Sequence, residues 1–150
     1  MANTLRIIGN IGRALDSIAN VEFKKFDLAK GQYLYLVRIL ENPGIIQERL
    51  AEMIAVDRTT SNRAIQKLVK NGLVTKVDDL NNQKIKHLYI TAAGETFAQV
   101  ILRENDYSTA VALTGFSTEE IATLNSLLER MDANVYADWR AVKKGQVRKY

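Results

Sequence analysis

Five polar side chains between residues 59 and 70 could contact nucleic acid, because their types and spacing gather hydrogen-bonding groups on one helical face. They are Thr59, Asn62, Arg63, Gln66 and Lys70, which recur at spacings of 3, 1, 3 and 4 residues. Hydroxyl, amide and guanidinium groups reach base edges and phosphates in a major groove. The face carries no acidic residue. Most polar stripes are only solvated helix faces, so the rest of the sequence must decide between the two interpretations.

Other kinds of chemistry find little support in the residue types. The chain has no cysteine and one histidine, His87, which argues against disulfides, thiol nucleophiles and the usual zinc sites. The sequence shows no Gly-rich phosphate loop, no Ser/His/Asp set and no pair of carboxylates at a catalytic spacing. Asp78 and Asp79 are more simply a solvated pair in a turn. We therefore expect neither an enzyme nor a bound metal or cofactor.

Length and charge are compatible with a single globular domain that meets a polyanion. The 150 residues are 47% hydrophobic and 25% charged, which is a globular composition. Twenty-one Lys and Arg residues against 17 Asp and Glu residues give a net charge of +4, which permits a polyanionic partner without requiring one. No long apolar run or secretory signal pattern is present, so no membrane association is expected. The lack of cysteine fits a reducing cytoplasm.

The middle of the chain predicts helices followed by a β-hairpin. We expect helices at about residues 30–41, 47–54 and 57–71, and strands at 73–77 and 86–90. Pro43 and Gly44 end the first of these helices, Asp57 caps the third, and Gly72 marks its end. The polar segment 78–85 forms the turn of the hairpin. Two short helices joined by a tight turn and followed by such a hairpin are typical of a winged helix-turn-helix.

Long helices are predicted at both ends of the chain. The first spans about residues 3–24, and its apolar arc is about 200° wide, whereas a helix packed on its own domain needs only ~100°. Thr91 can cap a second helix that runs to about Leu113. Ser117 and Glu120 form a capping box that opens a last helix of roughly 25 residues with an apolar stripe. Burial in the chain's own core is one explanation; the one we favour is a dimer bundle built from both chain ends.

The middle segment resembles the MarR family of bacterial transcription regulators. The resemblance rests on Leu50-Ala51-Glu52, Val56-Asp57-Arg58-Thr59-Thr60, Arg63-Ala64-Ile65-Gln66-Lys67-Leu68, Asn71-Gly72-Leu73-Val74 and Leu88-Tyr89-Ile90-Thr91-Ala92-Ala93-Gly94. It covers about residues 28–94, and the Leu-x-Ile-Thr-x-x-Gly ending is its most specific part. The resemblance implies a homodimer of winged helix-turn-helix protomers, each of which places its second motif helix in a major groove.

The resemblance also suggests which side chains would meet DNA. The predicted recognition-helix set comprises Arg58, Thr59, Thr60, Asn62, Arg63, Gln66 and Lys70, and the predicted wing set comprises Asn82, Lys84 and Lys86. The family's wing usually reads Asp-x-Arg, but the matching positions here are Asn82-Gln83-Lys84. Lysine keeps the charge but loses the planar fork of arginine. Minor-groove reading by this wing is therefore open, whereas phosphate contact is expected.

The complete prediction is a mainly α protein with a small β-hairpin wing. Residues 28–94 would form the DNA-binding lobe, and residues 1–27 and 95–150 the helical dimerisation region, within one compact domain. The function would be that of a sequence-specific double-stranded DNA-binding repressor that recognises an inverted-repeat operator and is released by a small aromatic or apolar effector. Phe23, Phe26, Tyr33 and Val37 could line the effector pocket, although plain core is the commoner role of such residues. The alternative is a protein–protein adaptor that kept the winged fold.

Overall fold

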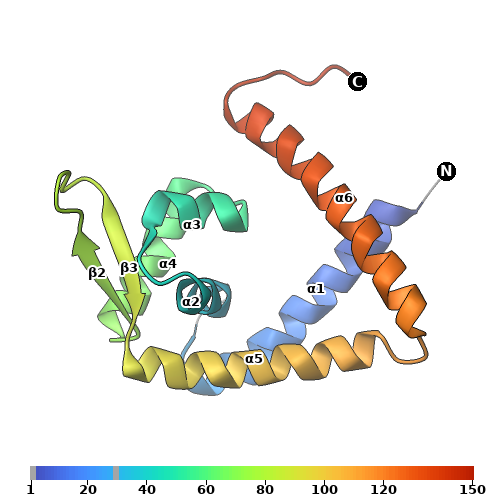
Figure 1. Ribbon diagram of the computed structural model, residues 1–150, viewed down its shortest axis with the longest axis horizontal. Coiled ribbons are helices and arrows are strands. Elements are labelled where there is room, and N and C mark those ends of the chain that lie inside the picture. The colour runs from blue at the N-terminus through green and yellow to red at the C-terminus, as the bar shows by residue number, and fades with distance from the viewer. Residues whose placement is uncertain (1–2, 29–30) are drawn as a thin grey trace. The chain divides into compact units, whose positions relative to one another are not determined.

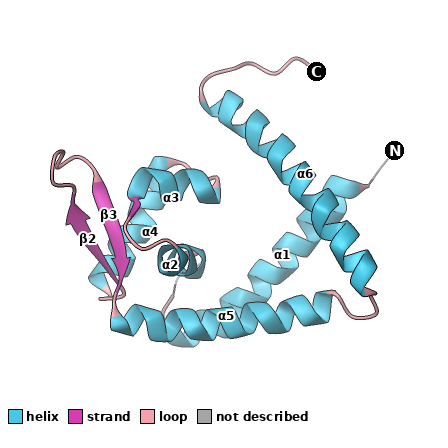
Figure 2. Cartoon of the chain, viewed as in Figure 1, coloured by secondary structure: helices cyan, strands magenta, loops and turns pink. Residues whose placement is uncertain are grey.

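The computed structural model describes residues 3–28 and 31–150, which form two compact units, residues 1–108 and 109–150. The first unit contains every strand of the described chain and every helix that begins before residue 109, except the end of the helix that spans the boundary (Figures 1 and 2). That boundary lies after Ser108. The assignment of residues 28–94 to DNA binding and of their flanks to dimerisation stays a prediction.

Two helices and a short 3-10 turn begin the first unit. They are α1 (Thr4–Phe23), η1 (Lys24–Phe26) and α2 (Gln32–Glu41). The predicted start of the second helix at residue 30 lies outside the described residues. Helix α2 is largely buried, and Asn42 and Pro43 follow its end. The phenol of Tyr33 donates to Asp16 on α1 at 3.3 Å, and burial together with this carboxylate raises the pKa of Tyr33 to about 12.

The helix-turn-helix consists of α3 (Gln47–Ile54) and α4 (Arg58–Lys70). Ala55 follows the last residue of α3 as its C-cap and adopts the left-handed conformation with φ of 58°. Helix α4 begins after Asp57, whose side chain caps it as the sequence predicts. Helices α2 and α3 both pack against α4. The buried face of α4, formed by Ser61, Ile65 and Leu68, therefore fixes which residues it turns outward.

The wing is part of a three-stranded antiparallel sheet. Strands β2 (Val74–Asp78) and β3 (Lys86–Ile90) form the predicted hairpin, with the first strand starting one residue later than expected. A third strand, β1 (Ile45–Ile46), pairs with the other side of β3, so the order is β1-β3-β2. Sequence reasoning missed β1 because two residues carry no periodicity, and their extended shape depends on the partner strand.

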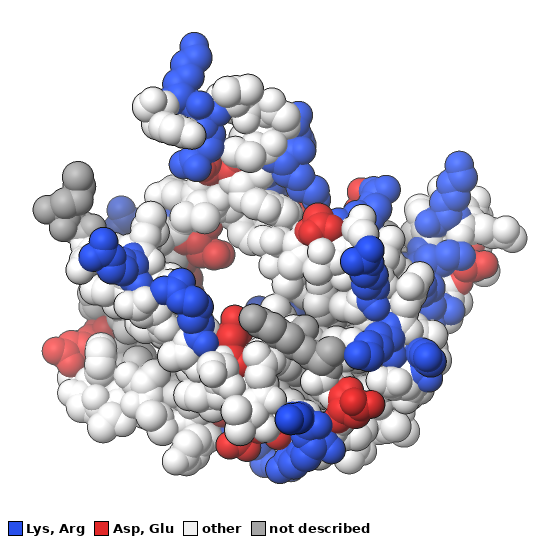
Figure 3. Space-filling view, turned by 180° about the vertical axis from the view of Figure 1, so that it is seen from behind, with Lys and Arg blue, Asp and Glu red and all other residues white. Residues whose placement is uncertain are grey.

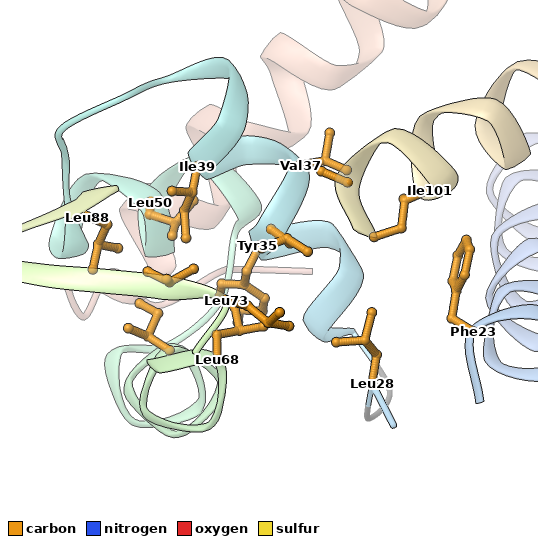
Figure 4. Close-up of a cluster of buried hydrophobic side chains, with 14 of the residues drawn as sticks. Phe23, Leu28, Tyr35, Val37, Ile39, Leu50, Leu68, Leu73, Leu88 and Ile101 are labelled. Atoms are coloured by element: carbon orange, nitrogen blue, oxygen red, sulfur yellow. The ribbon is translucent and has the colours of Figure 1, made fainter. Parts of the chain in front are cut away.

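One hydrophobic core unites these elements in the first unit. Its buried side chains come from α1, α2, α3, α4, the sheet and α5 (Ala92–Ala112), and Figure 4 labels ten of them. Leu36, Leu50, Leu68 and Leu88 are completely buried. Full burial of one such side chain contributes about 1.5–3 kcal/mol to folding. This core packs α4 and the base of the wing against each other.

The start of helix α5 is in direct contact with the segment that follows the helix-turn-helix. The Thr91 N–H donates to the Leu73 carbonyl at 3.0 Å, and the Thr91 hydroxyl donates to the Gly72 carbonyl at 2.7 Å. A Cβ at position 94 would lie 2.1 Å from the Leu73 carbonyl oxygen, so Gly94 is what permits this close approach. The Thr-x-x-Gly motif thus allows the start of α5 to pack closely against the segment that leads into the wing.

The second unit consists of the end of α5, α6 (Thr118–Lys143) and the residues that follow. Ser117 and Glu120 form the predicted capping box, with contacts of 3.1 and 2.9 Å. No residue of α6 is buried, and Leu128, Val135 and Val142 of its apolar stripe are exposed. None of the helices in the described part of the chain is long and apolar enough to cross a membrane.

Candidate nucleic-acid interface

The first turn of α4 is organised by the Asp57 carboxylate. Its Oδ1 accepts from the Thr60 N–H at 2.8 Å, and its Oδ2 accepts from the Thr60 hydroxyl at 2.6 Å. These hydrogen bonds lower the pKa of Asp57. The Thr60 proton is therefore directed at the cap, and its oxygen keeps only acceptor capacity for an outside group. Neighbouring Arg58 pairs with Glu48 of α3 at 3.0 Å in an exposed contact.

The remaining predicted side chains lie on the outer face of α4. Thr59, Arg63, Gln66 and Lys70 are all exposed. Along its whole length α4 carries four basic and no acidic side chains, so its outward face combines neutral polar groups with positive charges only. Figure 3 shows Lys and Arg side chains gathered on the side of the first unit that carries the wing. A polar and basic helix face without acidic residues, next to a projecting hairpin, fits the backbone and groove of a duplex.

Asn62 is held by a residue that sequence reasoning did not select. Gln47, the first residue of α3, donates its Nε2 to the Asn62 Oδ1 across the helix-turn-helix. With its oxygen engaged, Asn62 has its amide N–H groups left to offer to an acceptor. Fifteen residues separate the partners, and no local pattern connects them. Lys67, also absent from the predicted set, is exposed on α4 one turn after Arg63.

Side chain to backbone contacts shape the wing turn. The Asp79 Oδ2 accepts from the N–H groups of Asn81 and Asn82, at 3.0 and 3.2 Å. The Asn82 Oδ1 accepts from the Lys84 N–H at 3.1 Å, so the Asn82 side chain stabilises the turn by a hydrogen bond to its own backbone. Lys84 is exposed, whereas Lys86 is only half-exposed and pairs with Asp78. Of the three predicted wing residues, Lys84 is thus the freest to reach a phosphate.

His87 connects the wing turn to the other side of the sheet. Its Nδ1 lies 2.8 Å from the Gly44 carbonyl oxygen, and its Nε2 lies 2.8 Å from the Asp79 Oδ1. The hydrogen bond with Asp79, followed by that with the Gly44 carbonyl, raises the pKa of His87. The same contact, with help from the N–H groups of Asn81 and Asn82, lowers the pKa of Asp79. Neither here nor elsewhere among the described residues do three or more potential metal ligands cluster.

Of the four residues predicted to form an effector pocket, Phe23 and Val37 lie in the core, and Phe26 and Tyr33 pack against it. Their role in binding an effector stays a prediction. Phe23 and Val37 are buried, and the Phe23 ring packs 5.2 Å from that of Tyr33. Phe26 meets Phe97 edge to face at 5.1 Å. An open cavity of about 400 Å³ lies elsewhere, between α2, the α3–α4 turn and α4. Its lining comprises Gly31, Gln32, Leu34, Tyr35, Ile54, Val56, Thr60, Arg63, Ala64 and Lys67.

Comparison with known proteins gives the family. The model of the MarR family matches residues 28–86. The HTH-type transcriptional regulator YybA of Bacillus subtilis is 56% identical over 150 residues, which is all of both chains. The chain belongs to the MarR family.

Solved structures agree with this assignment. A MarR-family regulator from Listeria monocytogenes, determined in complex with a 26mer DNA, is 53% identical over 100% of both chains, with a TM-score of 0.96. A MarR protein from Peptoclostridium difficile is 37% identical over 94% of this chain and 92% of its own, with a TM-score of 0.90. The predicted family and winged fold class are confirmed. This MarR-family protein is a transcriptional regulator and not an enzyme.

Proposed function

We propose that this MarR-family regulator binds double-stranded DNA with α4 in the major groove and the wing along the backbone. The observation that carries the proposal is the acid-free, exposed face of α4, which packs through the shared core beside the wing. The Listeria relative whose structure contains DNA supports it, because it matches this chain over its full length. In this mode Arg63, Gln66 and the amide of Asn62 read base edges, and Lys70 meets phosphate.

The wing adds backbone contact to this arrangement. Lys84 is a point charge on a flexible stem at an exposed turn, so it suits a phosphate better than a base edge. The sequence around the operator then influences this contact only through the shape of the minor groove. We assign specificity to α4 and affinity to α4 and the wing together.

A homodimer would present two such lobes to an inverted-repeat operator. Helix α1 exposes seven large apolar side chains, which form one broad face: Leu5, Ile7, Ile8, Ile11, Leu15, Ile18 and Val21. An exposed apolar patch on this scale marks an association surface. The exposed stripe of α6 supports the same role for the C-terminal helix. The two-fold symmetry of such a dimer matches that of an inverted repeat.

Release by a small effector is the regulatory part of the proposal. The cavity beside α4 is largely apolar, and Thr60, Arg63 and Lys67 are among the residues that line it. A small apolar or aromatic molecule seated there would contact Arg63, which we assign to DNA. Binding to the two partners would then be mutually exclusive, so the effector would release the protein from DNA. We propose that the protein acts in this way as a repressor.

Titration of the protein into a labelled duplex taken from beside its own gene tests the proposal. We expect saturation at two chains per inverted repeat, competition by unlabelled specific duplex, and an affinity that falls steeply as salt rises. The expected effect of salt follows from counterion release at the phosphates that α4 and the wing cover. A dimer that shows no salt-dependent binding to any duplex would contradict the proposal and favour the protein–protein adaptor.

A further inference from the structure

His87 is surrounded by acceptors at both of its ring nitrogens. The Gly44 carbonyl oxygen faces Nδ1, and the Asp79 carboxylate faces Nε2, each at 2.8 Å. A neutral imidazole carries one N–H, so one of these contacts would set a nitrogen lone pair against an oxygen. Only the imidazolium donates to both acceptors. The geometry therefore matches the charged form of the ring.

The two acceptors belong to segments that are otherwise separate. Gly44 precedes β1 on one side of β3, whereas Asp79 opens the wing turn on the other. Through its second oxygen Asp79 holds the N–H groups of Asn81 and Asn82, and Asn82 holds the N–H of Lys84. A continuous series of hydrogen bonds thus runs from Gly44 through His87 to the backbone of Lys84.

The other groups around His87 do not compete for its proton. Its partners across the sheet are Ile46 on β1 and Val77 on β2, which are apolar. On its own strand the neighbouring Lys86 is paired with Asp78. The Tyr89 phenol lies next to Gly44, since a Cβ at position 44 would be 3.1 Å from its oxygen. Among the described residues, Asp79 is the ionised group that contacts the imidazole.

We propose that His87 is a positioning residue for the wing, whose imidazolium ties the turn that carries Lys84 to the β1 side of the sheet and makes DNA binding through the wing depend on pH. His87 does not itself touch DNA in this proposal. It acts through Asp79 on the turn. The inference rests on the proposed function, because it concerns how the wing meets a phosphate backbone.

The direction of the pH dependence follows from the raised pKa of His87 and the lowered pKa of Asp79. The pKa of His87 is raised above its ordinary 6.5, so the contact is complete below 6.5 and is lost as pH rises through the folded-state pKa. The pKa of Asp79 is lowered below its ordinary 3.8, so acid disrupts the contact only as pH falls through that lower value. Between these limits the wing turn is held, and at higher pH it loosens.

An NMR titration of the imidazole tests the contact directly. The chain has one histidine, so its ring signals need no assignment by mutation. We expect a midpoint above 6.5 in the intact protein, and the amide signals of Asn81, Asn82 and Lys84 should follow the same midpoint. Asp79→Asn should lower the midpoint, whereas the matched control Asp78→Asn, with the same change of charge one residue earlier, should not. Equal effects of the two variants, or a midpoint at or below 6.5, would overturn the proposal.

Operator affinity measured against pH tests the consequence for DNA. We expect the affinity of the intact protein to fall several-fold between about pH 6 and about pH 8.5, a window that spans the raised pKa of His87, with the profile flattened in both His87→Gln and Asp79→Asn. Asp78→Asn should keep the slope of the intact protein. An unaltered slope in the first two variants would refute the positioning role. Failure to bind any duplex at any pH would instead contradict the proposed function. The imidazole titration would still show whether His87 and Asp79 interact.

Discussion

Arg63 stands near the middle of the exposed face of α4, where a base contact is most consequential. Each good contact to a base edge is worth about 1–3 kcal/mol, and a symmetric dimer makes it twice. Arg63→Ala should therefore weaken specific binding by about thirty-fold or more, while leaving the thermal unfolding transition in place. Fluorescence anisotropy with operator and scrambled duplexes measures the loss.

Arg103→Ala is the matched control for this substitution. It removes the same charged group from an exposed position on α5, outside α4 and the wing. Its effect on operator affinity should be small, because only the general attraction between cation and polyanion is reduced. If the two variants lose affinity equally, Arg63 does not read a base, and the assignment of α4 as the recognition helix is wrong.

Lys84 allows the wing to be tested separately. Lys84→Gln removes one phosphate contact per protomer, so it should flatten the dependence of log affinity on log salt by roughly two for a dimer. The loss should be similar on all sequences, since phosphate contacts carry no sequence information. Lys84→Arg should instead tighten binding, most of all where an A·T-rich minor groove is narrow. A salt titration on two operators that differ only under the wing measures both effects.

An unchanged salt slope in Lys84→Gln would show that the wing does not reach the DNA.

At the scale of single residues, the sequence predicts which residue types lie on the outer face of α4, because the helical period of 3.6 residues fixes that face. It does not predict the Gln47–Asn62 or His87–Asp79 contacts. Each joins residues of different segments, and only the folded sheet and helix-turn-helix bring them together.

At the scale of the elements, Ala55 ends α3 in a conformation that favours glycine. A φ of 58° costs alanine about 1–2 kcal/mol because of its Cβ, and glycine avoids this cost. Glycine loses more backbone entropy on folding, however, and this loss offsets part of the gain. Ala55 is exposed, so its methyl group contributes little packing. Ala55→Gly should therefore stabilise the protein by roughly 0.5–1 kcal/mol. Urea unfolding followed by circular dichroism measures the change in midpoint.

Ala93 on the exposed first turn of α5 provides the comparison for this substitution. Ala93→Gly places glycine in a right-handed helix and should destabilise the protein by up to about 1 kcal/mol. Opposite signs for the two substitutions are the expected result. A loss of stability in Ala55→Gly would mean that the α3–α4 turn differs in solution.

The helix starts that carry a capping side chain are well predicted by the sequence. Asp57 and the Ser117–Glu120 box mark helix starts through chemistry confined to three or four residues, and both caps are formed. The hairpin also follows from its local pattern. Strand β1 does not, because it pairs with Leu88 and His87, which lie more than forty residues further along the chain. The sequence predicts the junction at Gly94 as a motif but not as a steric requirement.

At the scale of the whole molecule, the terminal helices predict a dimer. Sedimentation at micromolar concentration should give twice the chain mass of 16.9 kDa. Ile11→Glu places a charge on the apolar face of α1 at two symmetric positions, and burial of one isoleucine is worth about 1.5–3 kcal/mol. The dimer should therefore weaken by about a hundred-fold or more. Sedimentation velocity over a dilution series measures this change.

Asn10→Glu is the control for the dimer experiment, since it adds the same charge to the exposed polar face of α1 one residue earlier. Its dimer should survive dilution. A mass of 16.9 kDa for the intact protein would contradict the dimer.

At the scale of the whole molecule, the sequence identifies apolar residues but does not show which of them fill the core and which line a cavity. Phe23 and Val37 fill the core, and the cavity lies beside residues of mixed character that no pattern singles out.

The position of β2 at the outside of the sheet has a consequence for how the protein behaves at high concentration. No other strand of the described chain pairs with its outer side, so a row of backbone donors and acceptors is open to another molecule. Such edges are where sheets of different molecules join and aggregate. Here the edge is five residues long, and the exposed ammonium of Lys76 stands in its centre and would have to lose water. These features disfavour association through the outer side of β2, and the proposed self-association uses the helices instead.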